Sequence, residues 1–148
     1  MTVKKINSQH GFTLIELMIV IVILGILAGF IVPRIMGRPE EAKQLKAKMQ
    51  IEILETALKL YKLDTGMYPT TEQGLEALVE APDTGLIPKK WKKGGYLEKR
   101  KLPVDPWSNE YIYLSPGINS DFDISSYGFD GVPGGEDKNA DINNWEIE

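Results

Sequence analysis

The sequence contains few of the side chains from which an enzyme active site is built. His10 is its single histidine, and cysteine is absent. Serine residues are present, but a serine nucleophile needs a neighbouring base, which is most often a histidine. Carboxylates are frequent, yet none belongs to a motif that forms a recognisable pocket. The residue types therefore predict that the protein is not an enzyme.

Oxygen-donating side chains gather near the C-terminus. Residues 127–141 combine several glycines with Asp130, Glu136, Asp137, Asn139 and Asp141. Calcium takes six to eight oxygen ligands, including backbone carbonyls, so this composition suits it. The spacing is not that of an EF-hand, because Val132 and Gly134 occupy positions three and five when Asp130 is counted as the first. The pattern alone does not separate a calcium site from a solvated acidic turn.

One carboxylate, Glu16, interrupts an apolar run from Phe12 to Val32. As a helix this run would be about 31 Å long at roughly 1.5 Å per residue. The hydrocarbon core of a bilayer is about 30 Å thick, so the run predicts a transmembrane helix. A carboxylate in lipid costs about 2.5–3.5 kcal/mol on insertion scales. Glu16 therefore calls for a cationic partner.

The residues on either side of the apolar run limit its interpretation. Pro33-Arg34-Ile35-Met36 follows the run without the small residues of a secretory cleavage site, which argues against an ordinary signal peptide. More basic residues lie after the run than before it, so charge alone would place the C-terminal side in the cytoplasm. Pro33 and Gly37-Arg38-Pro39 interrupt helical hydrogen bonding and predict a kink.

The rest of the chain predicts an α+β domain. An amphipathic helix is expected from Pro39 to about Asp64, followed by a short helix from Thr70 to about Glu80. The apolar stripe of the long helix is expected to pack on the domain and comprises Ala42, Leu45, Met49, Ile53, Ala57 and Leu60, widened by Leu54, Leu58 and Tyr61. The N-terminal half of this helix has a narrower apolar face and is expected to line other helices instead. The alternating stretches EYIYLSPG and FDISSYGFDG predict a small antiparallel sheet of two or three strands on this helix. Trp107 and Trp145 are expected to help bury the sheet.

The stretch Gly11-Phe12-Thr13-Leu14-Ile15-Glu16 resembles the cleavage motif of type IV pilins and pseudopilins. This resemblance implies that a prepilin peptidase removes residues 1–11 and methylates the new N-terminal Phe12. It also implies that residues 12–33 form a hydrophobic transmembrane and assembly helix, and that residues 34–148 form a periplasmic domain. The protein would then be a single-pass inner-membrane protein before assembly. That orientation overrides the one given by the charge count.

Cleavage after Gly11 would also explain Glu16. It creates an amine on Phe12, and in an assembly Glu16 can meet the amine of a neighbouring subunit as the helices pack. Such a pair sets the axial stagger, which is the best-attested role of buried polar groups. The alternative is a charge tolerated near the membrane interface. We expect Glu16 to act in assembly, with Pro33 marking the end of the assembly helix.

Four further stretches, YPTTEQGLEALV, GGYLEKRKLPVDPW, YIYLSPG and SYGFDGVPGGEDKNADINNW, are similar to the major pseudopilins of type II secretion systems. This implies a type IV pilin-like fold and a homopolymeric periplasmic filament that drives export of folded proteins. The implied partners are minor pseudopilins, an inner-membrane assembly platform and the prepilin peptidase. The formal net charge of −4 argues against nucleic acid as the main partner.

Two other functions stay open at this point. A type IV pilin would form surface fibres for adhesion, motility or DNA uptake, but pilins usually close a C-terminal loop with a disulfide and this chain has no cysteine. A membrane-anchored, calcium-dependent binding module is the third reading, and it would not polymerise.

The resemblance also implies that the C-terminal loop binds Ca²⁺. In the pseudopilin pattern, Asp130 and Asp141 match acidic ligands, and Tyr127 and Val132 supply backbone carbonyls. Glu136 and Asn139 are less defined ligands, because the stretch between them varies within the family. Calcium would replace the missing disulfide, since a ligand that binds only the folded form stabilises it.

Overall fold

The computed structural model describes residues 12–35 and 38–147, and it describes side chains for residues 12–28 and 39–147. The leader 1–11, with Gly11 of the predicted cleavage site, lies outside the described residues, as does the side chain of Pro33. The chain divides into two compact units, residues 1–39 and 40–148.

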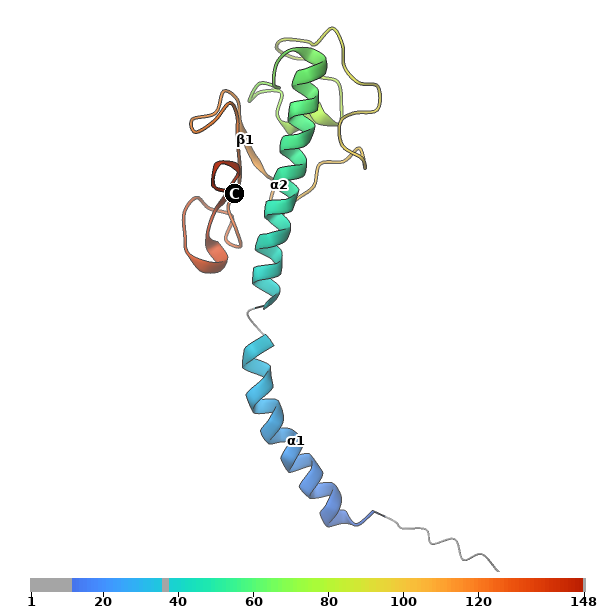
Figure 1. Ribbon diagram of the computed structural model, residues 1–148, viewed down its shortest axis with the longest axis vertical. Helices are drawn as coiled ribbons and strands as arrows, with labels where there is room; N and C mark the ends of the chain where they lie inside the picture. Colours follow the sequence, from blue (N-terminus) through green and yellow to red (C-terminus); the bar gives the residue numbers. More distant parts are fainter. Residues whose placement is uncertain (1–11, 36–37, 148) are drawn as a thin grey trace, which may run out of the picture. The chain divides into compact units, whose positions relative to one another are not determined.

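Helix α1, Leu14–Ile35, makes up most of the first unit (Figure 1). It is apolar around its circumference, and its described side chains are exposed. The helix continues past Pro33 to Ile35, so it is not interrupted at Pro33. Gly37, where a further interruption was predicted, lies outside the described residues. Within the part of the chain that the structure describes, no helix is both long enough and apolar enough to cross a membrane.

Helix α2, Arg38–Thr65, is the central element of the second unit. Pro39 lies in its first turn, where its missing N–H costs nothing, and Gly66 follows its end with φ +88°. One face of α2 is buried and forms part of the core. The residues of this face are Ala47, Ile51, Leu54, Ala57, Leu58 and Tyr61.

The predicted stripe of α2 was wrong in part. Ile53 and Leu60, which were expected to pack on the domain, are 57% and 44% exposed. Leu45 and Met49, in the N-terminal half, are 60% and 55% exposed. At 100° per residue these four residues lie opposite the face that carries Ile51, Leu54 and Leu58. The helix is therefore apolar on two faces, and periodicity alone could not tell which of them covers the domain.

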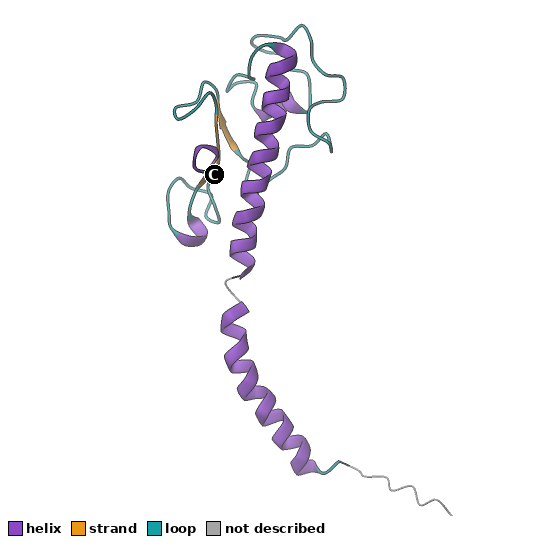
Figure 2. Cartoon of the chain, in the orientation of Figure 1, coloured by secondary structure: helices purple, strands orange, loops and turns teal. Residues whose placement is uncertain are grey.

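Three short strands form an antiparallel sheet in the order β1-β2-β3, which confirms the predicted sheet. Strands are coloured orange in Figure 2. They are β1, Ile112–Leu114, β2, Asp123–Ser126, and β3, Ile142–Asn143. Ile124 of β2, and Phe122 just before it, belong to the same buried core as the buried face of α2. The hydroxyl of Tyr111, just before β1, donates to Gln50 Oε1 of α2.

Three short 3₁₀ helices complete the secondary structure of the described residues: η1, Leu75–Leu78, η2, Asp137–Asn139, and η3, Asn144–Glu146. Thr70 and Gln73 make the reciprocal bonds of a capping box, since Gln73 N donates to Thr70 Oγ1 and Thr70 N donates to Gln73 Oε1. The box closes the turn that precedes η1, whereas η1 itself begins after Gly74 without a side-chain cap. The helix predicted from Thr70 to Glu80 is therefore shorter than expected and of 3₁₀ type.

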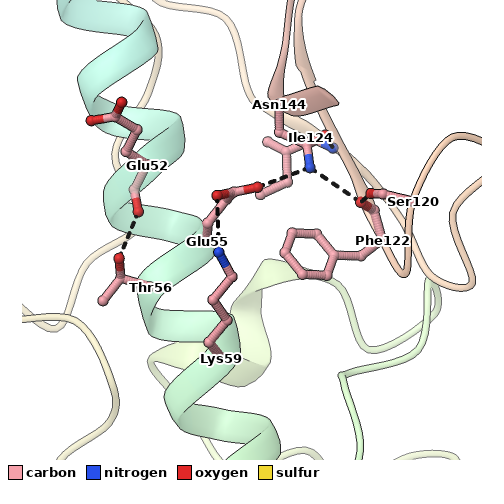
Figure 3. A network of polar contacts seen from close by, with 8 residues as sticks. All are labelled: Glu52, Glu55, Thr56, Lys59, Ser120, Phe122, Ile124 and Asn144. Carbon is pink, nitrogen blue, oxygen red and sulfur yellow. Dashed lines mark hydrogen bonds and ion pairs between the residues drawn. The ribbon is translucent and has the colours of Figure 1, made fainter. Parts of the chain in front are cut away.

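Asn144 ties the C-terminal segment to both layers of the domain (Figure 3). Its amide donates to Glu55 Oε1 on α2 at 3.1 Å and to the carbonyl of Phe122 at 3.2 Å. Its Oδ1 accepts the N–H of Ile124 on β2 at 2.8 Å. The prediction that the neighbouring Trp145 helps to bury the sheet was wrong, because Trp145 is 39% exposed. The buried contacts of this segment with α2 and β2 are made by Asn144 instead.

Asp123 organises the turn between β1 and β2. Its carboxylate accepts the backbone N–H groups of Ile118, Asn119 and Ser120. Burial by itself raises the pKa of this carboxyl, but the donated hydrogen bonds outweigh it and hold the pKa of Asp123 below its ordinary value. The folded state therefore favours the ionised form of Asp123.

We expect Asp123 to make the stability of the fold depend on acidity. Because its pKa is lower in the folded than in the unfolded state, its contribution is complete above about pH 4 and is lost as the pH falls through the folded pKa. Melting temperatures measured from pH 2 to 7 should fall less steeply at the acid end for Asp123→Asn than for the unchanged protein. Asp83→Asn, at an exposed position, is the control. Identical acid profiles for Asp123→Asn and the unchanged protein would refute this role.

Candidate assembly helix and candidate calcium loop

Phe12 and Glu16, of the predicted processing and assembly residues, lie at the start of α1, Phe12 two residues before the helix and Glu16 in its first turn. Phe12 is 85% exposed. The backbone N of Glu16 lies 3.3 Å from Thr13 Oγ1, and the backbone N of Thr13 lies 3.5 Å from Glu16 Oε2. Thr13 and Glu16 thus form a capping box at the start of the helix.

This capping contact gives Glu16 a local role that the sequence reasoning missed. The signal was present, because Thr13-Leu14-Ile15-Glu16 has the spacing of a threonine followed three residues later by a glutamate. While residues 1–11 are attached, the nitrogen of Phe12 is an uncharged amide. Within one uncleaved chain Glu16 therefore caps its own helix.

The exposed face of α2 borders a groove of about 390 Å³. Ile53 and Leu60 of α2 line one side of the groove, and Tyr96, Leu97 and Glu98 line the other. Large contiguous apolar patches are uncommon on the surfaces of monomeric soluble proteins. This face is therefore suited to contact with another protein surface.

The C-terminal loop, residues 127–141, folds back on itself beside the start of α2. Its first arm closes by a bond from Gly131 N to the carbonyl of Tyr127 at 3.2 Å. A second bond joins the two arms, from Phe129 N to the carbonyl of Lys138 at 3.1 Å. Gln44 of α2 donates to the carbonyl of Asp137 at 2.6 Å, so the loop is attached to the long helix.

Two buried side-chain oxygens in this loop have no hydrogen-bond partner, Asn139 Oδ1 and Asp141 Oδ1. The other carboxylate oxygen of Asp141 accepts the N–H of Gly134 at 2.8 Å. An unsatisfied buried oxygen is costly, and a bound cation is one of the ways to satisfy it. Asn139 and Asp141 therefore fit a cation that prefers oxygen ligands.

The remaining predicted ligands are placed less compactly. Asp130 Oδ1 accepts the N–H of Val132 at 3.3 Å, and Val132 is 53% exposed. Glu136 is exposed. Among the residues that the structure describes, no three histidine, cysteine, aspartate or glutamate side chains gather into one possible metal group. Asp130, Glu136 and Asp141 are thus not brought together as an acidic cluster.

Comparison with known proteins identifies the family of the chain. Residues 34–145 match the family model described as type II secretion system protein G. Residues 6–32 match the model of the prokaryotic N-terminal methylation motif. This matched range contains Gly11, Phe12 and Glu16.

Individual relatives agree with these matches. Type II secretion system core protein G of Pseudomonas aeruginosa is 56% identical over 140 residues, which are 95% of this chain and 97% of the relative. The protein of the same name from Vibrio cholerae is 53% identical over 145 residues, 98% of this chain and 97% of the relative.

A solved structure is similar to the fold as well. The crystal structure of the major pseudopilin from the type 2 secretion system of enterohaemorrhagic Escherichia coli matches with a TM-score of 0.68 at 44% identity. It covers 77% of this chain and 92% of the solved chain. The predicted pilin-like arrangement of a helix on a small antiparallel sheet is confirmed, and the chain belongs to the type II secretion system protein G family.

Proposed function

We propose that this protein is the structural subunit of a type II secretion pseudopilus, a filament that drives export of folded proteins across the outer membrane. The observation that carries the proposal is the match to the protein G family over residues 34–145, next to a methylation motif over residues 6–32. The exposed apolar surface of α1 supports it, because an assembly of such helices would bury that surface. Heterologous contacts that do not close on themselves produce a filament.

Each segment has a part in this proposal. A prepilin peptidase removes residues 1–11 and methylates Phe12, and the precursor is held in the inner membrane by residues 12–33 with residues 34–148 in the periplasm. An assembly platform and minor pseudopilins then act with the subunit as it polymerises. The exposed apolar face of α2 adds a second surface for neighbouring subunits to cover.

Calcium is the ion that we propose for the C-terminal loop. Asn139 and Asp141 support it most directly, because each has a buried oxygen without a partner. Asp130 and the carbonyls of Tyr127 and Val132 are the further ligands, and Glu136 is the least supported because it is exposed. A divalent cation there would neutralise acidic charge and join the two arms of a loop that also contacts α2 through Gln44.

Mass spectrometry of the membrane-extracted protein tests the proposed processing. We expect a mature chain that begins at methylated Phe12.

Electron microscopy of an overproducing strain should show fibres, which an anchored binding module would not form. A gene neighbourhood that encodes a pilus, rather than a secretion system, would favour the type IV pilin alternative. A protein that keeps Met1 in cells and stays monomeric would contradict the proposal.

A further inference from the structure

Asp105 is a buried carboxylate outside the proposed calcium loop, with 3% of its side chain exposed. Its Oδ1 accepts the backbone N–H groups of Trp107 at 3.0 Å and Asn109 at 2.7 Å. Its Oδ2 accepts the hydroxyl of Ser126, at the end of β2, at 2.7 Å. Asp105 therefore fixes the turn 105–109 to the sheet.

Asn109 extends from this turn to the first arm of the C-terminal loop. Its Nδ2 donates to the carbonyl of Gly128 at 3.0 Å and lies 3.5 Å from Asp105 Oδ2. Its amide also packs closely on Gly131, since a Cβ added there would lie only 3.2 Å from Asn109 Oδ1. One half-buried amide thus contacts both ends of the segment 128–131.

That segment contains or adjoins three of the proposed calcium ligands. Asp130 lies within it, and the carbonyls of Tyr127 and Val132 flank it. The backbone at Gly128 and Gly131 is left-handed, with φ of +62° and +68°. Left-handed turns among glycines are costly to order from the unfolded chain. A side chain that holds this segment in advance lowers the ordering cost of binding a ligand.

We propose that Asn109, oriented by Asp105, is a positioning residue that holds the first arm of the loop in the shape that receives a divalent, oxygen-preferring cation. This inference rests on the calcium part of the proposed function. Asn109 is not itself a ligand in this proposal, because its amide nitrogen faces the carbonyl of Gly128. Its effect on binding comes from fixing the backbone that carries the ligands.

Isothermal titration of the full-length protein in detergent with Ca²⁺ tests the proposal. Asn109→Ala removes the amide, and Asn109→Leu removes it while keeping a side chain of similar size. Loss of such a supporting contact typically lowers metal affinity by about 10–100-fold, so we expect the dissociation constant to rise at least about tenfold in both variants. Asn119→Ala is the matched control, because Asn119 bonds Asp123 in the β1–β2 turn instead; its affinity should stay within about twofold.

The melting temperature in a chelator, measured alongside, separates positioning from general destabilisation. A positioning role predicts that calcium raises the melting temperature of the Asn109 variants less than that of the unchanged protein. Unchanged affinity in Asn109→Ala and Asn109→Leu, with the unchanged protein binding Ca²⁺ normally, would overturn this inference alone. An unchanged protein that binds no Ca²⁺ would overturn both the calcium proposal and this inference, and would leave the filament proposal standing.

Discussion

We expect Glu16→Gln to remove nearly all fibres from a strain that overproduces this protein, while the precursor is still made and inserted. In the proposed filament the carboxylate of Glu16 meets the Phe12 amine of a neighbour in a desolvated position. Removing one partner of a buried pair leaves the other charge uncompensated, at a cost of about 3–5 kcal/mol. Since each 1.4 kcal/mol is a factor of ten, subunit addition should weaken at least about 100-fold. Sheared fibres quantified by immunoblotting and electron microscopy give the measurement.

Glutamine is the informative replacement because Glu16 has two roles to separate. The structure shows it capping the first turn of α1 with Thr13. A capping box accepts Gln as well as Glu, so Glu16→Gln keeps the cap and removes the charge. Thr13→Ala does the reverse, and loss of a cap costs about 1 kcal/mol. Normal fibres from Glu16→Gln, with few from Thr13→Ala, would assign Glu16 to helix capping. That outcome would contradict the proposed pair between Glu16 and the Phe12 amine of a neighbouring subunit. Glu41→Ala, at an exposed position on α2, is the control for losing a carboxylate.

The sequence predicted the elements of this fold better than their faces. The long helix and the antiparallel sheet follow from local patterns, namely Pro39 and Gly66 at the helix ends and alternation along the strands. The buried face of α2 does not follow, because the adjacent apolar residues Ile53 and Leu54 point about 100° apart, and only Leu54 is buried. Which of two apolar faces covers the domain depends on contacts with residues far along the chain.

The candidate calcium loop shows the same limit for side chains. Composition identified residues 127–141 as a candidate calcium loop, but it could not rank the oxygens within the loop as calcium ligands. The structure ranks Asn139 and Asp141 first because their Oδ1 atoms are buried without partners. It also adds Asn109, which no motif indicated, because 19 residues separate it from the carbonyl of Gly128 that it contacts. Long-range contacts of this kind leave no periodic signal in a sequence.

Calcium should raise the melting temperature of this protein, and Asp141→Ala should remove most of that rise. At a calcium concentration about 100 times the dissociation constant, binding to the folded form alone contributes about 2.7 kcal/mol. For the domain of residues 40–148, 1 kcal/mol shifts the midpoint by about 4 °C, so the expected rise is roughly 11 °C over the protein in a chelator. Calorimetry or circular dichroism in each condition gives the comparison.

Asp141 is the decisive position because its two carboxylate oxygens have different tasks. Oδ2 accepts the N–H of Gly134 and closes the loop, whereas Oδ1 is buried without a partner. Asp141→Asn can keep the bond to Gly134 while losing the negative charge, so it should fold normally in a chelator yet respond little to calcium. Asp83→Ala, at an exposed position outside the loop, should keep the full response. A full calcium response in both Asp141 variants would exclude Asp141 as a ligand, and equal melting of the unchanged protein with calcium and chelator would exclude the ion. Water would then have to satisfy the buried oxygens of Asn139 and Asp141. Because water binds without requiring a negative charge, Asp141→Asn would in that case be as stable as the unchanged protein.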